Sequence, residues 1–388
     1  MRPTTQYAFL ADELAARDAA AVVVIADGTD PTMRYCTRFV GPDRPYAFVF
    51  ADGDAMLCAP SLFEAQADRE FAGDIVYGPD TFAASAPADR AATVLEQCGI
   101  DSGSELLVPA AIPHDAALRL EAAGYELAST DAIAGARARK TEAEQGAIER
   151  ATRIAETGMV AAIEVIEEAV VEGRRVERDG DRLTTGTVRR AANAAIASAR
   201  GAPAGNTVVG AGRTAADLHF QGDVPIDPGE PVVIDVSPRG PGGYHADMTR
   251  TVAVGGEPGW ARRAHVAVEA ALEAALEAVD PGVRAAAVHE AAAAELRAHG
   301  FAIDRGGSRG FVHGTGHGVG LALHERPSIP GDGALEPGHV VTIEPGVYDP
   351  SEGGVRLEEL VVIGAETATV LTNESRSLSP TAHTADRD

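Results

Sequence analysis

The sequence predicts a two-domain α/β protein, in which a smaller α/β domain precedes a larger domain of helices packed on a mainly antiparallel sheet. Three observations lead to this prediction. The chain has 388 residues, more than one average domain needs. Short apolar runs alternate with helical stretches over its first third. Further on, long helical segments are followed by β-rich runs separated by Gly and Pro.

The first domain is expected over residues 1–135. AAAVVVIAD, from residue 19, predicts a buried strand, GTDPTM a turn, and YAFVFADGDAMLCAP a hairpin about a DGD turn. Helices are predicted over 61–71 and 87–97, and the second opens on a proline that suits a first helical turn. The apolar run ELLVPAA then predicts another strand.

The second domain is expected over residues 136–378, followed by a loose polar tail over 379–388. Its predicted helices cover 141–172, 184–200, 260–279 and 283–299. The first of them has a capping-box spacing between Thr141 and Glu144. The runs NTVVGAG, EPVVIDVS, MTRTVAVGG, HVVTIEPGVY and LEELVVIG predict short strands. We therefore expect helices covering a curved, largely antiparallel sheet.

The charge of the chain excludes one class of partner. With 58 acidic and 33 basic residues the formal net charge is −25, and Lys140 is the single lysine. A nucleic-acid binder needs the opposite field, so we expect no nucleic-acid partner. An acidic chain with almost no lysine resembles proteins from salt-loving organisms, where salt screens the repulsion between carboxylates. An ordinary acidic cytosolic protein is the alternative.

The cysteines and the apolar runs indicate the compartment. Cys36, Cys58 and Cys98 are widely spaced and form no CxxC pair, so buried free thiols are expected in place of disulfides or a zinc site. The sequence has no apolar stretch typical of a signal peptide and no run near the ~18 apolar residues that span a bilayer. We expect a cytoplasmic protein with no membrane partner.

Four carboxylates and a histidine stand beside the strand runs of the second domain. Asp235 ends one predicted strand and Asp247 begins the next, so a hairpin would bring them together. Glu344 and Glu358 lie on two consecutive strands that would also pair, and His317 lies in HGTGHGVG. Buried carboxylates are costly unless they are paired or coordinated. Four carboxylates and one imidazole could hold two divalent cations, and such an oxygen-rich site favours Mn²⁺, Co²⁺ or Fe²⁺.

Each of these residues also has an ordinary structural interpretation. An isolated Asp at a strand end is more often a turn or capping residue than a ligand. A lone histidine is more often a hydrogen-bonded surface or core residue. GTGHGVG fits no G-x-G-x-x-G register and lacks the Lys of a phosphate loop. The metal site is therefore indicated by the residues as an ordered set, and by no one of them alone.

In their order along the chain, these residues resemble the pita-bread metallopeptidase family, which includes methionine aminopeptidase, Xaa-Pro aminopeptidase, prolidase and creatinase. The segments GYHADMTRT, HGTGHGVGLALHE, TIEPGVY and GVRLEELV carry the resemblance. It implies two divalent metal ions per chain, Mn²⁺ first and Co²⁺, Fe²⁺ or Zn²⁺ otherwise. The implied ligands are Asp235, Asp247, His317, Glu344 and Glu358. The first two lie 12 positions apart where the family usually shows 11, and Ser237 replaces a glycine, so a longer hairpin turn is expected.

The resemblance covers nearly the whole chain and points to a subfamily. RKTEAEQGAIERATRIAETGM resembles the entry into the family's catalytic domain, and PTMRYCTRF resembles the creatinase-like N-terminal domain of its proline-specific members. Methionine aminopeptidases generally lack that domain, and creatinase lacks the full metal set. The resemblance thus implies an Xaa-Pro dipeptidase or aminopeptidase, in which a water or hydroxide bridging the metals attacks a small peptide with proline at its second position. It also implies a homodimer.

Individual roles follow from the same resemblance. Glu344 would bind metal and carry a proton from the attacking water to the leaving nitrogen. The residues that match the family's active-site histidines are His219, His313 and His324. His219 and His313 would hydrogen-bond the scissile carbonyl. The groups expected to orient the carboxylates are Thr249, Tyr348 and Arg356, whereas His245 and His339 are expected to be structural.

Two other functions stay open at this point. The same scaffold could serve a lyase or a C–N hydrolase that acts on a small non-peptide substrate. It could also be a binding protein that has lost catalysis, although the intact ligand set argues against that loss. The metal content of the purified protein would separate an enzyme from a binding protein.

Overall fold

The computed structural model describes residues 3–82, 86–256 and 259–383. The chain divides into two compact units, Met1–Arg137 and Ala138–Asp388, and each is described by itself. No helix within the described ranges is long and apolar enough to cross a bilayer.

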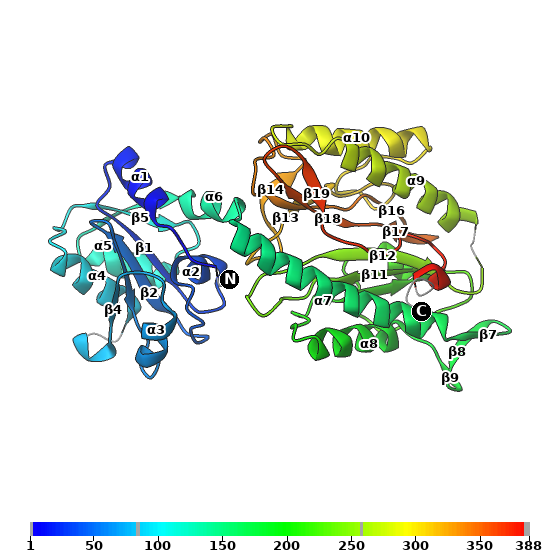
Figure 1. The fold of residues 1–388 in the computed structure, drawn as a ribbon, viewed down its shortest axis with the longest axis horizontal. Helices are drawn as coiled ribbons and strands as arrows, with labels where there is room; N and C mark the ends of the chain where they lie inside the picture. The colour runs from blue at the N-terminus through cyan, green and yellow to red at the C-terminus, as the bar shows by residue number, and fades with distance from the viewer. Residues whose placement is uncertain (1–2, 83–85, 257–258, 384–388) are drawn as a thin grey trace. The chain divides into compact units, whose positions relative to one another are not determined.

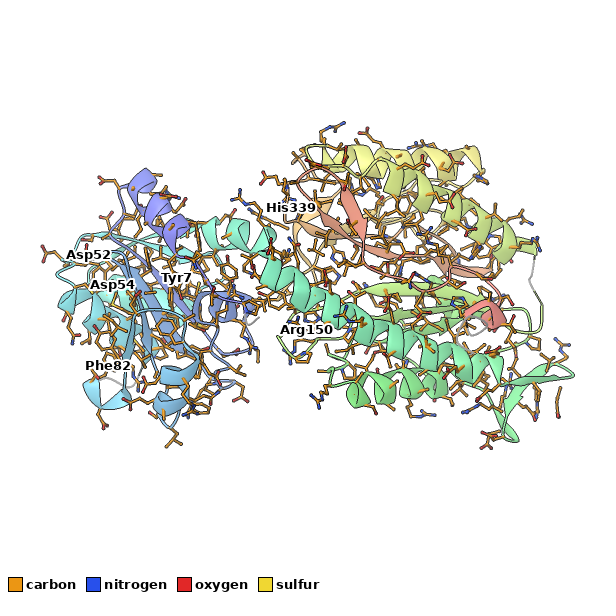
Figure 2. All side chains as sticks on the ribbon, in the orientation of Figure 1. Tyr7, Asp52, Asp54, Phe82, Arg150 and His339 are labelled. Carbon is orange, nitrogen blue, oxygen red and sulfur yellow. The ribbon has the colours of Figure 1, made fainter. Side chains whose placement is uncertain are left out.

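The first unit is built on a mixed six-stranded sheet in the order β4-β3-β2-β1-β5-β6 (Figure 1). Its strands are β1 Ala21–Ala26, β2 Tyr46–Ala51, β3 Asp54–Cys58, β4 Ile75–Tyr77, β5 Glu105–Pro109 and β6 Glu126–Thr130. The predicted hairpin is the antiparallel pair β2–β3, whereas β1 runs parallel to β5 and β5 runs parallel to β6. Its turn holds Asp52 (labelled in Figure 2) and Gly53 at positive φ, a conformation that Asp and Gly tolerate well.

The helices of this unit are α1 Ala8–Arg17, α2 Pro31–Thr37, α3 Glu64–Glu70, α4 Pro87–Gln97, α5 His114–Ala122 and α6 Ala132–Ala138, with the 3-10 helix η1 Pro79–Thr81. The segment GTDPTM forms the predicted turn at Gly28 and Thr29, but from Pro31 it is the start of α2. The Asp30 side chain accepts a hydrogen bond from the Met33 N–H at 2.8 Å, and Pro31 occupies the first turn, so the residues that suggested a turn begin a helix. Cys36 and Cys58 are buried and Cys98 is half-buried, all as free thiols.

The second unit carries four long helices, α7 Glu142–Glu167, α8 Thr185–Ser198, α9 Gly259–Glu277 and α10 Ala285–Ala298, and two 3-10 helices, η2 Gly212–Ala216 and η3 Pro380–His383. The predicted capping box is present: the Thr141 side chain accepts from the Glu144 N–H, and the Glu144 carboxylate accepts from the Thr141 N–H. In Figure 1, α7 and α8 lie on one side of the strands β11 and β12, and α9 and α10 lie on the other side of the unit.

The strands of this unit pair antiparallel wherever the described residues form a ladder, as the sequence predicts. They are β7 Val170–Glu172, β8 Arg175–Arg178, β9 Asp181–Arg182, β10 Val208–Ala211, β11 Pro231–Val236, β12 Met248–Ala253, β13 Gly316–Gly318, β14 Glu325–Ile329, β15 Val340–Ile343, β16 Gly346–Asp349, β17 Gly353–Arg356, β18 Glu359–Ile363 and β19 Ala368–Val370. Two sheets, β10-β11-β12 and β14-β13-β15-β18-β19, supply the strands that hold the carboxylates. The Glu358 N–H donates to the Thr249 carbonyl at 3.2 Å and joins the two sheets.

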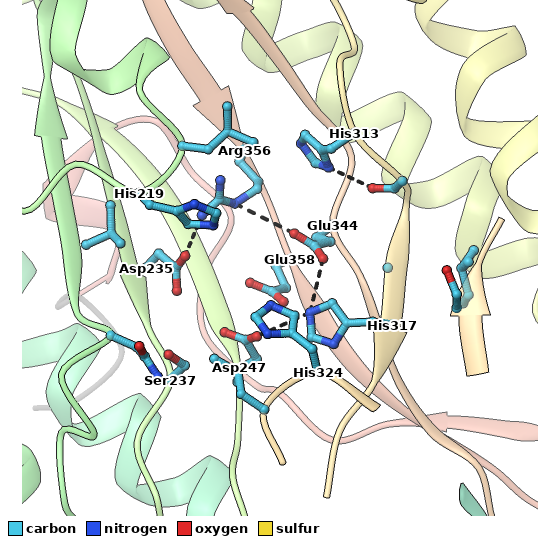
Figure 3. Close-up of a pocket in the computed structure, with 18 of the residues that line it drawn as sticks. His219, Asp235, Ser237, Asp247, His313, His317, His324, Glu344, Arg356 and Glu358 are labelled. Carbon is cyan, nitrogen blue, oxygen red and sulfur yellow. Dashed lines mark hydrogen bonds and ion pairs between the residues drawn. The ribbon is translucent and has the colours of Figure 1, made fainter. Parts of the chain in front are cut away.

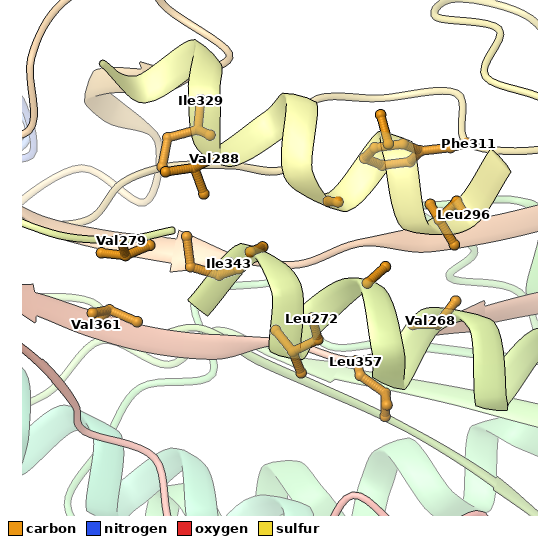
Figure 4. Close-up of a cluster of buried hydrophobic side chains, with 14 of the residues drawn as sticks. Val268, Leu272, Val279, Val288, Leu296, Phe311, Ile329, Ile343, Leu357 and Val361 are labelled. Carbon is orange, nitrogen blue, oxygen red and sulfur yellow. The ribbon is translucent and has the colours of Figure 1, made fainter. Parts of the chain in front are cut away.

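A buried apolar cluster lies between the helices α9 and α10 and the second of these sheets (Figure 4). Leu272 of α9 and Leu296 of α10 pack with Ile343 at the end of β15 and Val361 in β18. Burying a side chain of this size contributes about 1.5–3 kcal/mol. The cluster therefore fixes the strand ends from which Glu344 and Glu358 project.

Two predicted boundaries differ in the structure. The helix predicted over 141–172 ends at Glu167, and Val170–Glu172 instead forms the strand β7 of a small hairpin sheet. β-branched residues at 170 and 171 favour a strand, and they are exposed here, so no buried face continues the helix. The tail predicted to be loose from 379 forms η3 first, because the buried His383 ring bonds the Ser377 carbonyl at 2.8 Å.

Candidate metal centre

A pocket of about 510 Å³ in the second unit is lined by the predicted site residues (Figure 3). The residues that line it among those predicted are His219, Asp235, Asp247, His313, His317, His324, Glu344, Arg356 and Glu358. Thr249 and Tyr348 lie behind them and are buried. The structure thus brings together side chains from segments that are more than a hundred residues apart in sequence.

The two aspartates come from one hairpin. Strands β11 and β12 pair so that Val236 faces Met248, which sets Asp235 on the first strand and Asp247 just before the second at the same end of the hairpin. One oxygen from each of these aspartates and one from Glu358 lie within 4.8 Å of one another. Both aspartates thus join one cluster across the 12-residue step between them.

Glu344 and His317 form the opposite wall of the pocket. The His317 Nε2 lies 3.4 Å from the Glu344 Oε1 and 3.6 Å from the Asp247 Oδ2. Thr342, which the sequence analysis did not single out, holds both residues: its hydroxyl accepts from the His317 N–H at 3.0 Å and donates to Glu344 at 3.3 Å. Thr342 lies two residues before Glu344, and side chains two residues apart in a strand lie on the same face. This spacing was the signal in the sequence that could have predicted a contact between Thr342 and Glu344.

Arg356 is the cation that binds these carboxylates from behind. Its Nη2 donates to the Asp235 Oδ2 at 2.5 Å, its Nε to the Thr249 hydroxyl at 3.0 Å and its Nη1 to the Tyr348 hydroxyl at 3.1 Å. The Thr249 hydroxyl in turn donates to the Glu358 Oε2 at 2.7 Å. This network therefore orients two of the four carboxylates, those of Asp235 and Glu358. Such contacts are consistent with the predicted orienting role of Arg356 and Thr249.

The pocket contains more negative charge than the chain neutralises. The carboxylates of Asp235, Asp247, Glu344 and Glu358 outnumber the two arginines that line the pocket, Arg305 and Arg356. Burial raises the pKa of Asp247 well above its usual range, and the neighbouring Glu358 and Asp235 raise it further. Burial likewise raises the pKa of Glu358, with Glu344 adding to the rise, and burial raises the pKa of Asp235 although Arg356 opposes it.

This arrangement fits divalent cations. The Asp235 Oδ1 and the Glu358 Oε1 are buried and have no hydrogen-bond partner within the described residues. Each already uses its other oxygen, for Arg356 and for Thr249 respectively. Buried oxygens left open and turned toward other carboxylates are the donors that hard or borderline divalent cations bind, and such ions would remove the repulsion.

The three predicted histidines lie around the same pocket but in different settings. His324 and His219 are exposed at its edge, and the His324 ring centroid lies 4.3 Å from that of His317. His313 is half-buried: its Nδ1–H donates to the Gly314 carbonyl at 2.7 Å, and its Nε2 lies 2.9 Å from the Tyr348 hydroxyl. Burial lowers the pKa of His313, and the neighbouring Glu344 opposes the shift. Because Nδ1–H is donated to the Gly314 carbonyl, a neutral ring has its proton on Nδ1, and donation from Nε2 to a substrate would require a second proton.

The histidines expected to be structural are buried outside this cluster. The His245 Nδ1 lies 3.5 Å from the Ser237 carbonyl, and the His339 Nδ1 accepts from the Glu336 N–H at 3.1 Å. A residue that the sequence analysis noted only for its rarity, Lys140, is also buried and forms an ion pair with Glu325, the residue that follows His324.

An α/β unit with a buried carboxylate and histidine cluster built for divalent cations defines a metal-dependent class of protein. The chain belongs to metallopeptidase family M24: the family's sequence model matches residues 146–365, more than half of the chain. The match contains every residue of the predicted ligand set. Members of this family use divalent metal ions.

Three relatives show how far the similarity reaches. The probable dipeptidase PepE of Mycobacterium tuberculosis is 37% identical over 43% of this chain and 44% of its own length. An Xaa-Pro dipeptidase of Pyrococcus furiosus is 34% identical over 56% of this chain and 63% of its own. These sequence matches thus span less than two thirds of the relatives. The solved structure of the prolidase from Pyrococcus horikoshii aligns over 96% of this chain and 99% of its own, at a TM-score of 0.81 and 26% identity.

Proposed function

We propose that this protein is a metal-dependent exopeptidase that hydrolyses the bond between an N-terminal residue and a following proline. The observation that carries the proposal is the surplus of buried carboxylate in a pocket large enough for a small peptide. The similarity to an Xaa-Pro dipeptidase and to a prolidase supports the choice of proline.

Asp235, Asp247, His317, Glu344 and Glu358 would hold two divalent ions, which supply an activated water and polarise the scissile carbonyl. The rest of the chemistry belongs to the chain. Glu344 is fixed by the Thr342 hydroxyl and by its own N–H, which donates to the Thr315 carbonyl at 2.7 Å. A carboxylate held in this way can take a proton from the attacking water and return it to the leaving nitrogen.

A substrate with proline after the scissile bond suits a site that recognises the carbonyl and not the amide hydrogen. A peptide bond to proline is a tertiary amide without an N–H, so an enzyme that recognises the amide hydrogen cannot hold it. Recognition through the carbonyl needs no such hydrogen, and His219 and His324 stand at the edge of the pocket where a substrate carbonyl could be met. His313 joins them only in a state that places a proton on its Nε2.

Three finer properties belong to the same proposal. Oxygen donors outnumber the single imidazole, so Mn²⁺ is the first metal to test, with Co²⁺, Fe²⁺ and Zn²⁺ next. A homodimer rests on the family resemblance, and light scattering tests it. Halophilic adaptation rests on the net charge of −25 and on a surface without lysine, since the single lysine is 4% exposed. A melting temperature that stays constant from dilute buffer to molar salt would reject it.

The test compares matched peptides at fixed metal and salt: Ala-Pro against Ala-Ala, and Ala-Pro-Ala against Ala-Ala-Ala. We expect the proline peptides to be favoured by roughly 10- to 200-fold in kcat/KM, since alanine leaves part of a ring-sized pocket empty. A chelator should abolish hydrolysis, and Mn²⁺ should restore it. Cleavage of the dipeptide alone would mark a dipeptidase, and cleavage of the tripeptide an aminopeptidase.

Equal rates within both pairs would reject proline specificity. Metal binding without hydrolysis of any peptide would instead favour a reaction on a small non-peptide substrate. A protein that neither binds metal nor turns over a substrate would be a binding protein, and the proposal would fail.

A further inference from the structure

Lys140 combines two unusual properties. It is the single lysine of the chain, and its side chain is 1% exposed. Its ammonium Nζ lies 2.8 Å from the Glu325 Oε1, and the Glu325 side chain is 8% exposed. Long charged side chains are rarely buried as a pair for stability alone, because desolvation offsets most of the attraction. The pair therefore calls for a role that the metal centre does not explain.

The position of Glu325 suggests that role. It is the first residue of β14 and directly follows His324, the last residue of the bend over 321–324. His324 faces the pocket, with its ring against that of His317 (Figure 3), whereas Glu325 turns inward to Lys140. His324 itself is exposed, so its place in the pocket depends on the backbone that carries it.

The Glu325 carboxylate also supports the loop before His324. Its Oε2 accepts from the Ala322 N–H at 3.5 Å, and a Cβ added to Gly320 would collide with its Oε1. The Gly320 N–H donates to the Ala322 carbonyl at 3.0 Å. The loop from 320 to 325 is thus folded around this carboxylate.

Lys140 is held at the other end of the pair. It precedes the capping box of α7, its N–H donates to the Gly338 carbonyl at 2.7 Å, and its carbonyl accepts from the Gln145 side chain at 3.0 Å. A backbone fixed on both sides makes Lys140 a rigid anchor for Glu325.

We propose that Lys140 and Glu325 are positioning residues that hold the 320–325 loop and so aim His324 into the pocket. The inference rests on the proposed function only for its kinetic test. Lys140→Met should lower kcat for Ala-Pro by roughly 10-fold or more at unchanged metal content, the size of effect seen when an orienting partner is lost. The matched control is Arg139→Met: Arg139 is the neighbouring cation, and its ion pair with Glu336 at 3.3 Å is exposed.

A double-mutant cycle with His324→Ala separates positioning from general damage. If Lys140 acts through His324, adding Lys140→Met to His324→Ala should change kcat by less than about 2-fold. Fully additive losses would overturn the proposal. Should the loss of the Lys140 charge beside the buried Glu325 prevent folding, the double variant Lys140→Met/Glu325→Gln removes both charges and should show the same loss.

A second readout needs no turnover. In protein labelled with ¹⁵N-histidine, the imidazole signals that vanish in His324→Ala belong to His324. We expect these signals to shift in Lys140→Met and to stay in place in Arg139→Met. Unmoved His324 signals in Lys140→Met would refute the positioning role, even if the protein proved to hydrolyse no Xaa-Pro peptide. A wild-type protein inactive on Ala-Pro would reject the proposed function alone.

Discussion

Glu358 and Glu359 are consecutive residues, both at most 2% exposed, yet their carboxylates lie in opposite electrostatic surroundings. Glu358 faces the pocket, where burial and then the neighbouring carboxylates raise its pKa, and its Oε1 has no hydrogen-bond partner in the described structure. Glu359 faces the other way and is ion-paired with Arg250 at 3.1 Å and Arg376 at 2.6 Å. It also accepts a hydrogen bond from Thr372.

Arg250 shows how complete the second cluster is. Its side chain is fully buried and donates, besides the bond to Glu359, to the carbonyls of Thr249, Glu358, Glu374 and Ser375. Two consecutive buried carboxylates can therefore differ in kind: that of Glu359 is neutralised by arginines of the chain, whereas that of Glu358 has an oxygen available to a ligand. The first kind of charge is costly to leave without its partner, and the second creates a binding site at a cost to the empty protein.

The largest expected effect is the loss of hydrolysis when the carboxylate of Glu358, and not that of Glu359, is removed. Glu358→Gln should abolish the proposed hydrolysis, because the proposed metal site would lose an anionic ligand, and Asp247→Asn should do the same. Glu359→Gln removes the neighbouring carboxylate and should keep most of the activity when metal is saturating. Hydrolysis of Ala-Pro by the three variants, with circular dichroism to confirm folding, makes the comparison. Full activity in Glu358→Gln would remove that residue from the ligand set.

The second prediction concerns the satisfied cluster. Arg250→Met leaves the buried Glu359 with one cation fewer and should lower the free energy of unfolding by about 3–5 kcal/mol. Metal binding should persist in the folded protein. Urea unfolding followed by the fluorescence of Trp260, the single tryptophan, reports on the second unit. Arg139→Met, which breaks the exposed pair with Glu336, should cost no more than about 1 kcal/mol. Equal losses in both variants would contradict the assignment.

A third buried group, His339, avoids the problem of buried charge by staying neutral. Burial, together with the nearby Lys140, lowers its pKa to about 4. Below pH 6.5 the imidazole of residue 339 is protonated in the unfolded chain, but in the folded chain it is protonated only near pH 4. The free energy of unfolding therefore falls as the pH is lowered from 6.5 to 4. The loss reaches about 3 kcal/mol. His339→Asn should flatten this part of the stability profile, whereas His114→Asn, at an exposed position, should leave it unchanged. An unaltered slope in His339→Asn would show that its pKa is ordinary.

The smallest effect separates binding from chemistry inside the pocket. His313→Ala should keep the metal content and lower kcat by roughly 10²-fold, as expected when a group near the reacting carbonyl is lost. The exposed His299, at the end of α10, offers the control variant His299→Ala, which should behave as the wild type. A stability loss with near-normal turnover would make His313 a structural partner of Tyr348 and nothing more.

The fold and the pocket differ in how much the sequence could predict. Strand and helix positions followed from apolar runs and their periodicity, and Asp235 and Asp247 came together because the two consecutive strands pair as a hairpin. The end of α7 was missed, since Ala- and Val-rich sequence beyond Glu167 fits a helix as well as a strand. The start of α2 was missed because Asp-Pro marks a turn and a helix N-terminus alike.

The side-chain contacts between residues far apart in the chain could not be predicted from the sequence. The family resemblance separated Glu358 from Glu359 as an implied ligand, but it could not predict that Glu359 pairs with Arg250 and Arg376, which come from other parts of the chain. The Lys140–Glu325 pair joins residues 185 positions apart, and only the rarity of lysine hinted at it. Likewise, the Nδ1 proton of His313 depends on the carbonyl that its ring meets in the folded chain.

The proposed function depends on one property of the pocket, which is that its unbalanced carboxylates bind two divalent cations. Equilibrium dialysis of the metal-free protein against Mn²⁺, with the bound metal counted per chain, tests it most directly. We predict about two equivalents for the wild type and for Glu359→Gln, and fewer for Glu358→Gln. Absence of bound metal in the wild type, or equal binding by Glu358→Gln and the wild type, would contradict the account.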